Sequence, residues 1–383
     1  MTGAPRWDIF CRVIDNYGDI GVCWRLSRQL AAEHGISIRL WVDEISSLHR
    51  ICPDINPDFS IQHWQGVEVR RWIEPFPAIT PAEVVIEAFG CTLPANYVAA
   101  IAQQLSLAKV RNSLVWINLE YLSAESWIES YHGLPSPHPN LPLIKYFFFP
   151  GFTEVTGGLI REHDLLRQRV TQQQNFADFW QKIKLPVPDP AETTISLFCY
   201  DNPQINNLLD AWAASPSTVR CLLPESKVLP NIAQWATREK LVPGDFVQRG
   251  SLLLHILPFL PQEDYDHLLW ACDCNFVRGE DSFVRAQWAA KPLIWQIYPQ
   301  QDNAHQVKLD AFLDRYCQKL TKTAAASLRT FHLGWNQGGH LDWETFWQNQ
   351  TTLQIHATTW VQQLTLIGDL ASNLVNFSKK PAL

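Results

Sequence analysis

Apolar, strand-like segments alternate with segments of helical periodicity in both halves of the chain, and this alternation constrains the fold more than any other feature. The first half contains WDIFCRVI (7–14), ISIRLWV (36–42), VVIEAFG (84–90), LVWINLEYL (114–122) and KYFFFPGF (145–152). The second half contains TTISLFCY (193–200), STVRCLLP (217–224), LLLHILPFL (252–260), CDCNFVRG (272–279) and KPLIWQIYP (291–299). Buried parallel strands have this continuous apolar character, and helices connect them. The pattern predicts two doubly wound, Rossmann-like α/β domains in series.

A change in composition marks the boundary between the halves. A stretch that begins near Gly157 contains the Gln-rich run TQQQN and ends in closely spaced prolines. We expect an N-terminal domain over residues 1–160, a linker over 161–190 and a C-terminal domain over 191–357. An amphipathic C-terminal helix, residues 358–383, is expected to pack back on the first domain. Ligands would then bind in a central cleft that both domains face, at the carboxyl ends of both sheets.

Composition disfavours several classes of partner. The chain has 383 residues and a formal net charge of -7, without the basic stripe that nucleic-acid binding requires. Its nine Cys form no CxxC pair, which is typical of reduced thiols in a cytosolic protein. We find neither a signal-peptide pattern nor an apolar run near the roughly 20 residues that span a bilayer. The expectation is a cytoplasmic protein that binds neither nucleic acid nor membrane.

The turn after the first strand, in FCRVIDNYGDIG, carries two acids, Asp15 and Asp19. A dinucleotide-binding turn would read GxGxxG, with an acid after the second strand. Asp43 fits the last requirement, but only Gly18 and Gly21 are present, and two acids would repel a diphosphate. One alternative is that Asp19 caps the helix or interacts with its dipole. Two acids four residues apart, facing a cleft, favour instead a general base with a partner.

The corresponding turn in the second half, VRGEDSFVRA, has a different character. Arg278, Gly279 and Ser282 suit a diphosphate bound by free backbone N–H groups at a helix start. Glu280 and Asp281 complicate this interpretation because they are acids beside an anion. Asp281 could cap the helix with its side chain turned away, and Glu280 could orient a sugar or ribose hydroxyl.

Two further strand ends contribute groups suited to a nucleotide base. LFCYDN leaves Phe198 and Tyr200 at one carboxyl end, and LPFLPQEDYD leaves Phe259 and Gln262 at another. Aromatic and amide groups would converge there, where a base could stack and form hydrogen bonds. The alternative for each aromatic residue is a place in the core.

The sequence predicts no metal site. Asp264 and Asp266 form a DxD that resembles the metal and sugar-nucleotide motif of a different transferase fold. On a helix these two side chains diverge by about 200°, so we interpret them as a solvated or capping pair. The twelve His show no HExxH and no paired metal-ligand spacing.

Four long segments resemble the elongation factor P arginine rhamnosyltransferases, the EarP family. They are FCRVIDNYGDIGVCWRLSRQLA, LFCYDN, LPFLPQEDYDHLLWACDCNFVRGEDSFVRAQWA and KPLIWQIYPQQDNAH. The resemblance runs in order over nearly the whole chain. It implies a GT-B glycosyltransferase that needs neither metal nor cofactor and transfers rhamnose from dTDP-β-L-rhamnose, with inversion, to an arginine of elongation factor P.

The resemblance also implies roles for individual residues. It places the family's aspartates on Asp15 and Asp19, with Asp19 as the base. It places the donor site on Phe198, Tyr200, Phe259, Gln262, Arg278, Glu280, Asp281 and Ser282. Two alternatives stay open: a GT-B enzyme with another nucleotide sugar or acceptor, and a non-catalytic protein that binds a basic partner through the acidic turn.

Overall fold

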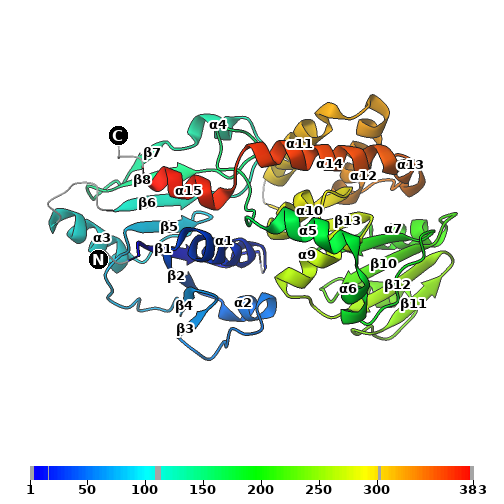
Figure 1. The fold of residues 1–383 in the computed structure, drawn as a ribbon, viewed down its shortest axis with the longest axis horizontal. Coiled ribbons are helices and arrows are strands. Elements are labelled where there is room, and N and C mark those ends of the chain that lie inside the picture. The colour runs from blue at the N-terminus through cyan, green and yellow to red at the C-terminus, as the bar shows by residue number, and fades with distance from the viewer. Residues whose placement is uncertain (1–3, 16, 108–113, 301–302, 380–383) are drawn as a thin grey trace. The chain divides into compact units, whose positions relative to one another are not determined.

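The protein consists of two α/β units, each built on one sheet. The computed structural model describes residues 4–15, 17–107, 114–300 and 303–379 (Figure 1). Unit 1 comprises residues 1–163 together with 364–383, and unit 2 comprises residues 164–363. In both sheets the interior strands are parallel, as the predicted α/β class requires.

The sheet of unit 1 has eight strands in the order β3-β4-β2-β1-β5-β6-β8-β7. The strands are β1 (Arg6–Cys11), β2 (Ser37–Val42), β3 (Ile61–Trp64), β4 (Val67–Arg71), β5 (Val84–Ala88), β6 (Val115–Leu119), β7 (Pro135–Pro137) and β8 (Ile144–Phe148). The outermost pairs, β3 with β4 and β7 with β8, are antiparallel, and the other pairs are parallel. Because β1 pairs with β2 on one side and β5 on the other, the strand order reverses at β1. A ligand site is expected beyond the carboxyl end of such a strand.

The helices of unit 1 cover this sheet, and the central one is deeply buried. They are α1 (Gly18–His34), α2 (Ile45–Ile51), α3 (Ala95–Leu107), α4 (Trp127–Tyr131) and α15 (Leu370–Ser378). Helix α1, dark blue in Figure 1, packs on β1, β2 and β4 and also contacts α2 and α15. All of its residues from Gly18 to Ser27 are buried. The first turn of α1 therefore lies inside the unit, directly after β1.

The sheet of unit 2 has six strands in the order β11-β12-β10-β9-β13-β14. The strands are β9 (Thr193–Leu197), β10 (Val219–Pro224), β11 (Phe246–Arg249), β12 (Leu252–Leu257), β13 (Cys274–Arg278) and β14 (Leu293–Gln296). Only β11 runs antiparallel to its neighbour among the pairs of this sheet that the structure describes. Strand β9 pairs with β10 on one side and β13 on the other, so the strand order reverses here as it does at β1.

Among the described residues, unit 2 carries more helices than unit 1, and the last of them, α14, ends in unit 1. They are α5 (Leu165–Gln174), α6 (Ala177–Lys182), α7 (Ile205–Ala213), α8 (Leu229–Trp235), α9 (Gln262–Ala271), α10 (Asp281–Ala289), α11 (Ala304–Tyr316), α12 (Lys322–Gln337), α13 (Trp343–Trp347) and α14 (Gln350–Leu366). A short 3-10 helix, η2 (Cys317–Lys319), follows α11. Among the helices of both units that the structure describes, none combines the length and apolar character needed to cross a membrane.

Two segments differ from the expected domain boundaries. Most of the expected linker, 161–190, belongs to unit 2 and forms α5 and α6, because Leu165, Phe179 and Trp180 are buried there. The expected C-terminal helix, 358–383, is divided between the end of α14 and α15. Gly368 has φ +85° and Asp369 caps α15, so the chain turns between the two helices. Residues 380–383 lie outside the described residues.

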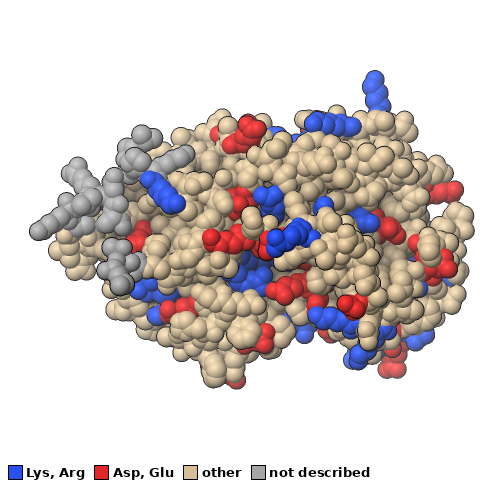
Figure 2. Space-filling model, viewed as in Figure 1, with Lys and Arg blue, Asp and Glu red and all other residues tan. Residues whose placement is uncertain are grey.

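All nine Cys residues are buried, and none forms a disulfide. On the surface, Lys and Arg side chains are interspersed with Asp and Glu on the face drawn in Figure 2. Within that view neither sign of charge forms a continuous stripe.

A buried ionic network fixes β1, the strand that leads to the acidic turn. The carboxylate of Asp8 is fully buried and accepts two hydrogen bonds from Arg39 on β2, each 2.5 Å long. The hydroxyl of Tyr97 on α3 and the backbone N–H of Ala82, at 3.1 Å, also donate to it. Both charges are thus paired, and the additional donors satisfy the remaining lone pairs of the carboxylate.

The substitution Asp8→Asn should destabilise unit 1 strongly. It would leave the buried guanidinium of Arg39 without a counter-charge, which costs about 3–5 kcal/mol when one partner of a buried ion pair is removed. Urea or thermal unfolding of the purified variant measures the loss.

The matched control for this experiment is Glu68→Gln. Glu68 pairs with Arg70 on the same sheet, but both side chains are partly exposed. Exposed ion pairs contribute about 0–1 kcal/mol, so this variant should unfold close to the parent. Equal losses in the two variants would show that the Asp8 network does not anchor β1.

Candidate active site

Asp19 lies in the first turn of α1, and its carboxylate organises the turn that precedes the helix. The side chain is 1% exposed. Its Oδ2 accepts hydrogen bonds from the backbone N–H of Ile14 at 2.8 Å and of Asp15 at 2.9 Å. Asp19 therefore caps the backbone of the turn and not the helix itself, which corrects the simple helix-cap alternative.

Asp15 packs against the start of the same helix. Its backbone oxygen accepts from the N–H of Gly18 at 2.6 Å, and its side chain is buried. A Cβ atom on Gly18 would lie 2.6 Å from Oδ2 of Asp15, so only glycine leaves room for this carboxylate. Gly18 is thus explained by the acidic turn and not by a bound diphosphate. The protein's own carboxylates occupy the region where a dinucleotide-binding turn would hold phosphate.

Burial raises the pKa of the Asp19 carboxyl above its ordinary value. The hydrogen bonds from the backbone of Asp15 and Ile14 and from the side chain of Tyr121 act in the opposite direction, whereas the negative charge of Asp15 raises the pKa further. A carboxylate with a raised pKa is a better proton acceptor than one in water. The arrangement suits a general base.

Sequence analysis did not identify two aromatic residues that stack on each other, one of which contacts Asp19. Phe89 follows β5 and Tyr121 follows β6; their rings stack with centroids 4.5 Å apart and planes 18° apart. The side chain of Tyr121 forms a hydrogen bond with Asp19. Both lie at the carboxyl end of a predicted apolar run, as Phe198 does, and applying that criterion to the first half would have found them.

Asp43, which fitted a ribose-binding acid by position, has a local role. Its Oδ1 accepts from the backbone N–H of Val13 at 3.0 Å, and its Oδ2 lies 3.7 Å from Nε of Arg12. The guanidinium of Arg12 lies over the ring of Trp72, 5.0 Å from its centroid. Asp43 therefore supports the acidic turn from the end of β2.

In unit 2, Arg278 brings two of the predicted aromatic residues together. Its guanidinium lies 4.5 Å from the ring centroid of Phe198 and 4.4 Å from that of Tyr200. Phe198 follows β9, and Arg278 ends the neighbouring β13. The backbone N–H of Tyr200 donates to Oε1 of Gln296, at the end of β14, at 2.8 Å. These predicted residues therefore gather at the carboxyl ends of adjacent strands.

The segment from Arg278 to Ser282 forms a tight loop before α10. Gly279 has φ +59°, a conformation that glycine adopts without strain. The backbone N–H of Arg278 donates to Oγ of Ser282 at 3.1 Å, and Ser282 donates in turn to the oxygen of Arg278. Glu280 is the N-cap residue of α10 and makes no side-chain cap.

The remaining predicted residues lie on α9 and just before it. Gln262 donates from Nε2 to Oδ2 of Asp281 at 3.1 Å, so Asp281 is engaged by an amide instead of capping its helix. The ring centroids of Phe259 and Phe198 are 6.5 Å apart, and the two rings meet edge to face. Sequence analysis missed Tyr265. Its ring centroid lies 5.6 Å from that of Phe198, and its side chain forms a hydrogen bond with Ser282.

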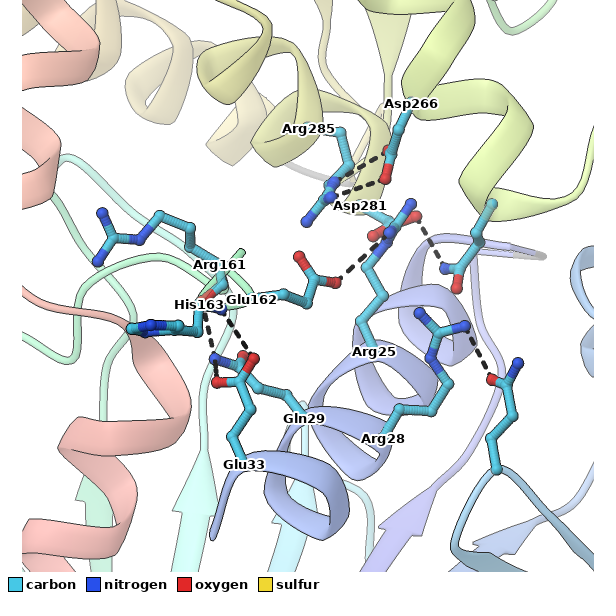
Figure 3. Close-up of polar contacts among 12 residues, drawn as sticks. Arg25, Arg28, Gln29, Glu33, Arg161, Glu162, His163, Asp266, Asp281 and Arg285 are labelled. Carbon is cyan, nitrogen blue, oxygen red and sulfur yellow. Dashed lines mark hydrogen bonds and ion pairs between the residues drawn. The ribbon is translucent and has the colours of Figure 1, made fainter. Parts of the chain in front are cut away.

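The DxD residues are engaged by different cations. Asp264 forms an ion pair with Lys182 at 2.5 Å. Asp266 is buried and accepts from Nε of Arg285 at 2.9 Å and from its terminal nitrogen at 2.6 Å (Figure 3). The prediction of a solvated or capping pair is therefore wrong for Asp266. Within the residues that the structure describes, no group of His, Cys, Asp and Glu side chains is placed to hold a metal ion.

Comparison with known proteins identifies the family. The family model described as "Elongation-Factor P (EF-P) rhamnosyltransferase EarP" matches residues 7–379. A protein-arginine rhamnosyltransferase of Pseudomonas putida is 48% identical over 97% of this chain and 98% of its own length. A protein-arginine rhamnosyltransferase of Shewanella oneidensis is 41% identical over 99% of both chains.

A solved structure, described as the structural basis for EarP-mediated arginine glycosylation of translation elongation factor EF-P, has the same fold. It is 36% identical to this chain and superposes with a TM-score of 0.68 over 97% of this chain and 98% of its own. The predicted GT-B fold and the predicted enzyme class, protein-arginine rhamnosyltransferase, are confirmed by these likenesses. This chain belongs to the EarP family of elongation factor P rhamnosyltransferases.

Proposed function

We propose that this protein transfers rhamnose from dTDP-β-L-rhamnose to an arginine side chain of translation elongation factor P, with inversion at the anomeric carbon and without a metal ion. The descriptions of the family and of the solved relative name elongation factor P, which supports this acceptor. The observation that carries the proposal is the buried carboxylate of Asp19, held by two backbone N–H groups with a raised pKa. The protein would act in the cytoplasm, where its acceptor is found.

The acceptor explains why carboxylates lie in the turn after β1. A guanidinium has a pKa above about 12 and delocalised lone pairs, so it is a poor nucleophile in water. Asp15 and Asp19 would bind its charge and turn one nitrogen toward the anomeric carbon. As the C–N bond forms, the C–O bond to the diphosphate breaks and Asp19 takes the proton from that nitrogen.

The cluster in unit 2 would bind the donor. Phe198, Tyr200 and Phe259 supply aromatic surface for the base, and Gln262 supplies an amide. The backbone N–H groups at the start of α10, together with Arg278, would stabilise the charge of the departing dTDP.

The three polar residues around the start of α10 complete the proposed donor site. Glu280 would orient a hydroxyl of the sugar or ribose. Asp281 and Ser282 hold the loop in shape through Gln262 and Arg278. The diphosphate would thus be stabilised by protein groups alone.

The variant Asp19→Asn should lose catalysis but keep donor binding. The amide oxygen can still accept from the backbone of the turn, whereas the charge and the proton acceptor are gone. Loss of a general base lowers the rate by about 10² to 10⁴. Single-turnover assays, with mass spectrometry to detect one added deoxyhexose on elongation factor P, measure the effect.

Asp43→Asn is the matched control for that substitution. Asp43 also accepts a backbone N–H from the same turn, and the amide oxygen of Asn would still accept it. Its activity should stay close to that of the parent. Near-normal turnover by Asp19→Asn would end its assignment as the base.

The variant Phe259→Ala should weaken donor binding. A lost base-stacking contact is worth about 1–3 kcal/mol, or roughly 5- to 150-fold in affinity. Calorimetry with dTDP-rhamnose measures the change. Phe246→Ala removes a phenylalanine that packs on His255, away from the cluster, and should leave the affinity unchanged. Equal donor affinity of both variants and the parent would remove Phe259 from the proposed site.

Activity should survive EDTA and should gain nothing from added Mg²⁺ or Mn²⁺. The physical reason is that Arg278 and the start of α10 would stabilise the leaving diphosphate without a cation. The measurement is the initial rate of rhamnosylation after chelation and after each ion is returned. A rate that falls with chelator and recovers with either ion would contradict metal independence.

A further inference from the structure

Tyr121 and Phe89 occupy the ends of neighbouring strands next to the acidic turn. Strands β5 and β6 pair in parallel with Ala88 opposite Leu119, so the residues just beyond both ends lie together. The backbone N–H of Phe89 donates to the oxygen of Leu119 at 2.6 Å. The aromatic rings stack 4.5 Å apart, which fixes the plane of the Tyr121 ring.

The backbone of Phe89 is strained. Its φ of +59° lies in the left-handed region, which is unfavourable for a bulky residue. Such conformations persist only where surrounding contacts determine them, and they concentrate at functional sites. Here the following Gly90, with φ +66°, continues the turn while the Phe89 ring stays against Tyr121.

The Asp19 carboxylate receives donors from both backbone and side chain. Oδ2 accepts from the N–H groups of Ile14 and Asp15. Tyr121 adds a side-chain hydrogen bond from the segment after β6. The backbone thus fixes the carboxylate from its own turn, and Tyr121 fixes it from a different part of the sheet.

We propose that Tyr121 is a positioning residue for glycosyl transfer: its hydroxyl, with its ring held by Phe89, keeps the Asp19 carboxylate in the orientation in which it takes the acceptor's proton. This inference rests on the proposed role of Asp19 as the base. Tyr121 acts through that carboxylate and need not contact the donor.

Among the described residues, Asp15 in the turn and Tyr121 after β6 are the titratable groups that shift the pKa of Asp19. Cys11 at the end of β1 is in turn affected by the charge of Asp19. Cys11 stays a neutral thiol because its hydrogen bond with Cys23, followed by burial, raises its pKa. Asp15 raises the pKa of Asp19, whereas the hydrogen bond from Tyr121 lowers it by stabilising the charged form. Removing that hydroxyl therefore raises the pKa of the base.

The test is Tyr121→Phe, which keeps the stacked ring and removes only the hydroxyl. The base works when deprotonated, so kcat rises with pH through its pKa. The acidic limb of the pH profile of kcat should move to higher pH. At a fixed pH on the acidic side, kcat should fall about tenfold for each unit by which the pKa of the base rises. At pH values above the pKa of the base, kcat should recover most of this loss. The affinity for dTDP-rhamnose should not change.

Tyr131→Phe is the matched control. Tyr131 is an exposed tyrosine of α4 in the same unit and packs against Trp127. Removing the hydroxyl of Tyr131 should not shift the pH profile of kcat. A Tyr121→Phe enzyme that merely melts earlier, with its acidic limb unmoved, would overturn the positioning role.

Asp19→Asn separates this inference from the proposed function. If that variant is inactive while Tyr121→Phe leaves the limb unmoved, only the role of Tyr121 fails. If Asp19→Asn is as active as the parent, the base assignment fails and the positioning role fails with it.

Discussion

The burial of the Asp19 carboxylate against the backbone of its own turn is the interaction on which the site in unit 1 depends. Burying a carboxylate costs free energy, and its raised pKa records that cost. Because the folded-state pKa lies above the unfolded one, this group contributes less to stability as pH rises through the interval between them. At neutral pH the folded state thus carries an unfavourable term, which the burial of apolar residues elsewhere in unit 1 must offset.

Helix α1 connects this carboxylate to the segments where the chain leaves and re-enters unit 1. Near its far end, Nε2 of Gln29 donates to the backbone oxygen of Arg161 at 2.7 Å and to Oδ1 of Asp369 at 3.1 Å. Glu33 accepts from the backbone N–H of His163 at 2.7 Å (Figure 3). One buried helix therefore carries Asp19, the proposed base, at its first turn and holds both crossing segments near its last turn. A change in either segment would act on the element that positions Asp19.

Sequence patterns predicted what depends on neighbouring residues along the chain. The apolar runs predicted most strands of both sheets but missed β3, β4, β7 and β11, which are short and lie at or next to sheet edges. Polar residues just after the predicted strands indicated the acidic turn and the residues around Arg278. The patterns missed what depends on contacts between distant segments. The few apolar residues of α5 and α6 lie among polar ones, so the pattern did not show that these helices are packed. Arg285 pairs with the buried Asp266 only because α9 packs on α10. The contact between Tyr121 and Asp19 depends on the order of the strands, which places the end of β6 near the turn after β1.

The two units use one structural feature with opposite electrostatics. In each, a strand at or beside the point where the strand order reverses leads through a glycine-containing turn into a helix, and a helix start attracts anions. Unit 1 fills that position with its own carboxylates, and the absence of a Cβ on Gly18 leaves space for Asp15. Carboxylates beside that helix start would favour a cation, such as the guanidinium of the proposed acceptor, over an anion. In unit 2 the side chain of Asp281 is engaged by Gln262, and Arg278 stands at the strand end. That helix start suits an anionic ligand, so the same α/β scaffold would serve an acceptor cation in one unit and a nucleotide diphosphate in the other.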